Sequence, residues 1–147
     1  MSRKAVLKYV ELKSGHGDSG PAWIAHVVLS KTGRSLYFGR KGLKLIKKGG
    51  VSGNCFDMET GAEWWVSGVK KYGLNRHWAG SGKIFIEAGA VDEYLQLTGQ
   101  KELDKKNFQV VPDFEPPDIA RFHELENKLS DPAAYAELVE RHLNAAR

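Results

Sequence analysis

Short apolar runs separated by turn residues fill the first hundred positions of this 147-residue chain. Each run is rich in Val, Ile, Leu and aromatic residues and is bounded by Gly, Ser, Asn or Asp, a pattern typical of β-strands. The predicted strands lie at residues 4–13, 22–30, 35–39, 41–46, 54–58, 63–71 and 83–87. Gly33 and Gly61 stand in tight connections and supply the positive φ that a short hairpin needs. The pattern predicts a small, twisted, mainly antiparallel barrel of the Tudor-like kind.

Residues 22–30 carry apolar side chains on both faces of their predicted strand. One face presents Trp23, Ala25, Val27 and Leu29, and the other presents Ala22, Ile24, His26 and Val28. Because only one face of a strand can fill a barrel core, the second face needs a cover. The C-terminal part of the chain can supply that cover.

The pattern becomes helical after residue 87. Residues 90–99 predict a short helix that closes on Gly99, and residues 108–111 predict a late strand. Proline opens a second helix over residues 116–129, with Ile119, Phe122, Leu125 and Leu129 on one side. We therefore divide the chain into a barrel-like domain with its short closing helix, 1–99, and a second part, 100–147.

A third helix follows a very short link, because Ser130, Asp131 and Pro132 stop one helix and cap the next. Its apolar stripe consists of Tyr135, Leu138, Val139, His142 and Leu143. Helices this short are not stable alone, so the hairpin must pack on the barrel or on another molecule.

Charge divides the chain at almost the same place. Residues 1–85 hold 15 Lys and Arg against 5 Asp and Glu, whereas residues 86–147 hold 7 against 13. Acidic helices could therefore cover a basic barrel, or the basic half could bind an anionic partner. A single cysteine and the lack of an apolar run of about 20 residues predict a cytoplasmic protein that spans no membrane.

The loop between the first two predicted strands is similar to the nucleophile loop of chymotrypsin-like serine proteases, through residues 17–20. Here Pro21 follows at once, where that family has a second glycine. Residues His16, Asp18 and Ser19 also lie too close in sequence to converge as a catalytic triad. The loop is therefore interpreted as an exposed turn, and Trp23 beside it as the more informative residue.

No other pattern supports catalysis. The five histidines have no metal-ligand spacing, and the glycine-rich segments lack the phosphate-loop pattern. Cys55 is interpreted as a small buried side chain, and only a pocket that joined it to Asp57 and His77 would suggest chemistry. We expect no metal, no cofactor and no enzymatic activity.

Aromatic and basic residues interleave in residues 63–83, which is typical of surfaces that bind single-stranded nucleic acid. A basic cluster in residues 40–48 could extend this surface. The candidate nucleic-acid-binding residues are Trp64, Lys70, Lys71, Tyr72, Arg76, His77, Trp78, Lys83, Arg40 and Lys41. The alternative is that the tryptophans belong to the core and the lysines are ordinary solvated edge residues.

The chain resembles a family of small bacterial proteins across about residues 6–98. The resemblance is carried by three segments, YVELKSGHGDSGPAWIA, SGNCFDMETGAEWWVSGVKK and NRHWAGSGK. The resemblance implies an intracellular bacterial protein and brings no functional residues with it. From the residues, we expect a binding module for nucleic acid. The alternative is an interaction or scaffold protein whose C-terminal helices bind a protein partner or a second copy.

Overall fold

The computed structural model describes residues 5–16, 19–45, 53–72, 75, 82–129 and 131–145. Six strands form a closed antiparallel barrel in which each strand pairs with the next and the first pairs with both the second and the sixth. They are β1 (Ala5–Leu12), β2 (Ala22–Leu29), β3 (Ser35–Phe38), β4 (Lys41–Leu45), β5 (Cys55–Asp57) and β6 (Glu63–Gly68). The predicted barrel is confirmed, and Gly33 and Gly61 have the expected positive φ.

The seventh predicted strand departs from the expected arrangement. Residues Ile84–Glu87 form β7, which lies outside the barrel and pairs parallel with β2. β8 (Phe108–Val111) then pairs parallel with β7 and ends the sheet. A parallel neighbour requires the chain to cross from one end of the barrel to the other, which the strand pattern alone does not reveal.

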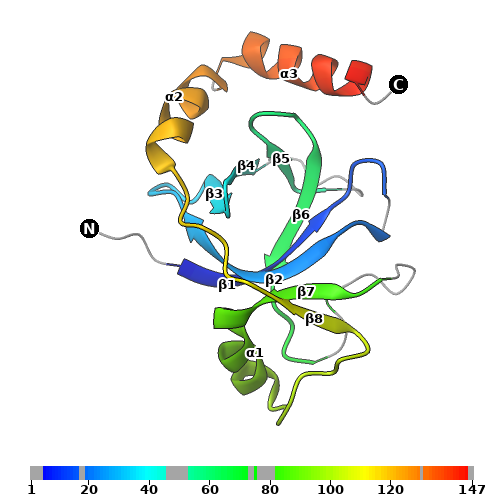
Figure 1. Cartoon of the computed structure of the whole chain (residues 1–147). Coiled ribbons are helices and arrows are strands. Elements are labelled where there is room, and N and C mark those ends of the chain that lie inside the picture. Colours follow the sequence, from blue (N-terminus) through cyan, green and yellow to red (C-terminus); the bar gives the residue numbers. More distant parts are fainter. Residues whose placement is uncertain are drawn as a thin grey trace.

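The two faces of β2 serve two different cores, as expected. Ala25 and Val27 point into the barrel and pack with Val10, Leu43 and other interior residues. On the outer face, Ala22 and Ile24 pack against Ile86 of β7 and Tyr94 of α1 (Val91–Thr98). Gly99 closes α1 in the left-handed conformation. Figure 1 shows α1, β7 and β8 together on one side of the barrel.

The predicted helical hairpin covers another side of the barrel (Figure 1). It consists of α2 (Ile119–Leu129) and α3 (Pro132–Ala145). Phe122, Leu129 and Leu138 are buried against Tyr37, Phe56 and Met58 of the barrel. The side chains of Val139, His142 and Leu143 lie outside the described part of the chain. None of the described helices is long and apolar enough to cross a membrane.

A candidate binding cleft at one end of the barrel

Three connections meet at the same end of the barrel, because the turns of an up-and-down meander alternate between its two ends. They are the β1–β2 loop, the β3–β4 turn at residues 39–40 and the β5–β6 turn at residues 58–62. The backbone N–H of Met58, in the β5–β6 turn, donates a hydrogen bond of 2.9 Å to the carbonyl of Gly42, near the start of β4. Arg40, Lys41 and Glu59 therefore lie close together although they are distant in sequence.

A cleft of about 510 Å³ opens at this end. Its volume lies within the range typical of ligand sites, and the mouths of β-barrels are common places for such sites. Aromatic side chains line the cleft together with charged ones. The lining consists of Trp23, Phe38, Gly39, Arg40, Lys41, Glu59, Phe114, Glu115 and Arg121.

The aromatic part of the cleft belongs to a larger ring cluster. The ring centroids of Trp23 and Phe38 are 5.3 Å apart, and those of Phe38 and Phe114 are 4.8 Å apart. The Trp64 ring packs against both Trp23 and Phe38, at 5.9 and 6.0 Å. Such contacts at about 4.5–7 Å are favourable, so the buried rings of Phe38 and Trp64 hold the partly exposed Trp23 and Phe114 rings in place.

Phe114 reaches the cleft from the segment that follows β8. Both oxygens of the buried Glu87 carboxylate hold backbone N–H groups, with Oε1 accepting from His26 at 2.8 Å and Oε2 from Phe114 at 2.9 Å. The neighbouring Asp113 accepts a hydrogen bond from the N–H of Gly89 at 2.7 Å. The segment is therefore tied to β2 and β7, which fixes the position of the Phe114 ring.

Cations and carboxylates alternate around the rim. Arg40 pairs with Glu115, with its Nε 2.6 Å from Oε2, and Arg121 of α2 pairs with Glu59. The side chains of Arg40 and Glu115 are 76% and 67% exposed. Exposed pairs of this kind contribute little free energy, about 0 to 1 kcal/mol, so the arginines can exchange partners. A smaller cavity of about 120 Å³ adjoins the cleft. It is lined by Arg40, Pro116, Asp118 and Arg121.

Lys41 is held differently. Its Nζ lies 3.5 Å from Oδ2 of the nearly buried Asp57 and 5.7 Å from the centroid of the Trp64 ring. Asp57 also accepts hydrogen bonds from the backbone N–H groups of Glu59 and Thr60 through Oδ1, at 2.8 and 3.2 Å. Asp57 therefore organises the β5–β6 turn and orients Lys41 at the rim, which is a structural role.

The candidate nucleic-acid-binding residues fall into separate groups. Arg40 and Lys41 line the cleft, whereas Trp64 is only 3% exposed and belongs to the barrel core. Its faces are therefore covered by protein. The indole N–H of Trp64 has no hydrogen-bond partner among the described residues. Arg76, His77 and Trp78 lie outside the described residues.

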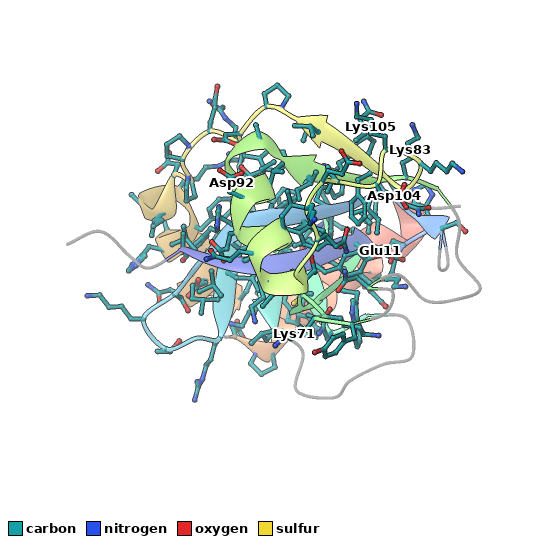
Figure 2. All side chains as sticks on the ribbon, turned by 90° about the horizontal axis from the view of Figure 1, so that it is seen from below. Glu11, Lys71, Lys83, Asp92, Asp104 and Lys105 are labelled. Atoms are coloured by element: carbon teal, nitrogen blue, oxygen red, sulfur yellow. The ribbon has the colours of Figure 1, made fainter. Side chains whose placement is uncertain are left out.

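Lys70, Lys71 and Tyr72 follow the last residue of β6, at the opposite end of that strand from the β5–β6 turn. All three are exposed, and Tyr72 is 80% exposed with Lys71 Nζ 5.8 Å from its ring centroid. Lys83 is also exposed, just before β7. Figure 2 shows Lys71 and Lys83 at separate places on the face that carries α1. The expected single strip over residues 63–83 is therefore divided.

Cys55 does not form a chemical site with Asp57. The thiol is fully buried in the barrel, and burial raises its pKa to about 12. The Asp57 carboxylate is committed to the β5–β6 turn, and His77 lies outside the described residues. A thiol with so high a pKa is a poor nucleophile at neutral pH.

A buried carboxylate lies on the outer face of β1. Glu11 is almost fully buried, and its Oε2 lies 2.7 Å from Nζ of Lys13. The hydroxyl of Tyr9 donates a hydrogen bond to its Oε1. Glu11 appears among the labelled residues of Figure 2. Because its charge is compensated by Tyr9 on the same strand and by Lys13 just after it, we interpret this cluster as structural.

The protease-like loop is a turn, as expected. His16 and Ser19 are exposed, and the backbone N–H of Ser19 donates to the carbonyl of His16 at 3.2 Å. Asp18 lies outside the described residues. A Cβ at Gly20 would lie 1.9 Å from the carbonyl oxygen of Leu12, so close packing of the backbone requires this glycine. The glycine thus has a packing function.

The cleft is the candidate functional site because of its shape and the side chains that line it. Within the described ranges, no group of three or more His, Cys, Asp and Glu side chains is arranged to hold a metal ion. Comparisons of the chain with models of protein families, with curated proteins and with solved structures find no match.

Proposed function

We propose that this protein is a non-enzymatic binding module for single-stranded nucleic acid and that the cleft is its principal contact. The observation that carries the proposal is the combination of two partly exposed rings, Trp23 and Phe114, with a cationic rim, Arg40, Lys41 and Arg121. Nucleic-acid bases stack on aromatic rings, and phosphates are contacted by Lys and Arg. Both kinds of contact are available within one concave site.

Charge supports phosphate binding at the rim only moderately, because two carboxylates accompany the three cations. The Arg40–Glu115 pair is largely exposed, however, so a phosphate can replace Glu115 at small cost. Arginine also presents a planar fork of donors that suits a phosphate. We therefore assign the phosphate contacts mainly to Arg40 and Arg121.

Lys70, Lys71 and Tyr72 form a second candidate contact. Tyr72 presents most of its ring to solvent beside two lysines, which is the pairing expected of a residue that stacks on a base. This contact lies away from the cleft, so it would bind a different part of a longer strand. Its contribution can be measured independently of the cleft.

The test is fluorescence anisotropy with labelled single-stranded DNA and RNA of about 15 nucleotides, at about 50 and about 200 mM salt. The variants are Arg40→Gln and Arg121→Gln, and the matched control is Arg34→Gln. Arg34 is exposed in the β2–β3 turn, at the other end of the barrel from the cleft. We expect both cleft variants to weaken binding about three- to tenfold and the control to leave it unchanged.

Two outcomes would contradict different parts of the proposal. Absence of binding at both salt concentrations would overturn the function. Binding that is lost in Lys71→Glu but unchanged in Arg40→Gln and Arg121→Gln would instead move the principal contact to the residue 70–72 segment. A circular dichroism spectrum of each variant establishes that it is folded.

The alternative function, protein interaction through the helical hairpin, has less support. The apolar stripe that motivated it contributes Phe122, Leu129 and Leu138 to the core. A groove of about 360 Å³ between the hairpin and the β5–β6 turn is lined by Met58, Leu125 and charged side chains, but nothing in it indicates a particular partner.

A further inference from the structure

β8 is the outermost strand of the sheet. It pairs with β7 on one side and ends the strand order, and Figure 1 shows it at the margin of the molecule beside α1. Val110 is 50% exposed on this strand. An edge strand with an exposed apolar residue is a template on which another strand can pair.

The hydrogen bonds to β7 determine which backbone groups of β8 point outward. The N–H of Ile84 donates to the carbonyl of Asn107 at 2.8 Å. Alternate residues face the partner in a parallel ladder, so Asn107 and Gln109 face β7, whereas Phe108 and Val110 turn their backbone groups away. The N–H of Phe108 is used within its own turn, by the carbonyl of Asp104 at 3.0 Å. Val110 therefore keeps both an N–H and a carbonyl without a partner in the described part of the chain.

We propose that β8 pairs antiparallel with β8 of a second copy of this chain, with Val110 opposite Val110 at a two-fold axis. Each Val110 then donates its N–H to the other and accepts at its carbonyl, which satisfies both groups. Two residues further along, Phe108 faces Pro112 of the second copy, and neither of them has a free N–H that this arrangement would bury. The two Val110 side chains cover each other.

Charge complementarity selects a second copy as the occupant. The turn before β8 carries Lys105 and Lys106 against Asp104, whose carboxylate is occupied within the turn by the N–H of Lys106 and the side-chain amide of Asn107. The segment after β8 carries the exposed Asp113 and Glu115. Antiparallel pairing brings the cationic turn of one copy beside the acidic segment of the other, twice by symmetry. Lysines at a sheet edge oppose pairing with strands in general, so a partner must supply acidic residues at that place. Figure 2 shows Lys105 near the start of β8, together with Asp104 and Lys83.

The strand is short, so we expect a dimer that dissociates on dilution. Asp113 can take part because only its Oδ1 accepts the N–H of Gly89. The interface would extend the sheet through both barrels. The same register brings Lys105 near Glu115, the partner of Arg40 at the cleft rim. Because the dimer is tested without nucleic acid, its failure and the failure of the proposed function are distinguishable.

The test is sedimentation velocity of the full chain over about two decades of protein concentration. We expect a reversible monomer–dimer equilibrium. Val110→Pro removes an N–H that faces the second copy and none that pairs with β7, so it should raise the dimer dissociation constant at least about tenfold. Val110→Thr keeps the N–H and is the matched control, with an expected change of less than about threefold.

A second pair of variants keeps the proposal testable if Val110→Pro does not fold. Lys105→Glu should weaken the dimer, whereas Lys101→Glu, an equal change of charge at an exposed residue further from β8, should not. A chain that is monomeric at every concentration would overturn the proposal. So would a dimer that resists both Val110→Pro and Lys105→Glu.

Discussion

Cys55 begins β5 inside the barrel, where the cost of burying a thiolate raises the pKa of its thiol from 9.0 to about 12. We expect the thiol of the folded protein to react with a thiol reagent such as dithionitrobenzoate only as fast as the protein unfolds. Addition of denaturant should release one rapidly reacting thiol per chain. Rapid reaction without denaturant would contradict the burial of Cys55.

The same shift makes stability depend on pH. In the unfolded chain the thiol ionises above about pH 9, whereas in the folded protein it stays protonated up to about pH 12. The unfolded state therefore binds fewer protons in this window, and the free energy of unfolding falls as pH rises, by up to about 1.4 kcal/mol per pH unit. Urea titrations at pH 8 and 10, compared with those of Cys55→Ala, isolate this contribution from other titrating groups.

Single residues differ in how far the sequence determines their place. Alternation correctly puts Trp23 on the same face as Val27, and that face points into the barrel. For Trp64 and Trp65, alternation requires opposite faces without saying which is inside. The structure buries Trp64 in the barrel and leaves Trp65 partly exposed on the outer core. The inward choice depends on pairing with β1 and β5, which are distant in sequence.

At the scale of elements, the packing of α2 on the barrel includes one especially close contact. A Cβ at Gly42 of β4 would lie 2.6 Å from the buried ring of Phe122. We expect Gly42→Ala to force this ring away and to lower the free energy of unfolding by about 1 to 3 kcal/mol. Gly68→Ala is the matched control, because a Cβ at Gly68 meets nothing within 4 Å.

Chemical denaturation of the two variants measures the difference. We expect the Gly42→Ala and Phe122→Leu changes to be non-additive, because the smaller side chain makes room for the methyl group. Equal stability of Gly42→Ala and Gly68→Ala would mean that α2 does not pack on β4 as described.

The order and type of the elements could be predicted, because each depends on local pattern. The structure has these elements where the sequence predicts them: seven strand segments, the helix closed by Gly99 and the hairpin after Pro116. The parallel pairing of β7 could not be predicted, since it depends on where the preceding connection leads the chain. For the same reason the sequence did not indicate that Phe114 and Arg121 join Arg40 at the cleft. The only sequence feature that singles out Phe114 is that it is an aromatic residue close to several prolines.

At the scale of the whole molecule, the basic and acidic parts of the chain meet at the cleft. Glu115 of the acidic part pairs with Arg40 of the barrel, and the reverse arrangement joins Glu59 of the barrel to Arg121 of α2. Each part of the chain thus supplies one cation and one carboxylate to the ion pairs that join the two parts. Each of the three cations at the cleft has a carboxylate partner, because Lys41 pairs with Asp57.

Salt dependence provides a quantitative check of how many cations contact a bound strand. If Arg40, Lys41 and Arg121 each neutralise one phosphate, a logarithmic plot of the binding constant against salt concentration should have a slope of about −2, at about −0.7 per phosphate. Arg40→Gln should reduce the steepness by about 0.7 and Arg34→Gln should not change it. Anisotropy titrations at four or more salt concentrations give these slopes.

A slope near zero would show that binding is not ionic, and an unchanged slope in Arg40→Gln would remove Arg40 from the contact. A slope much steeper than about −2 would instead add the exposed lysines that follow β6, Lys70 and Lys71.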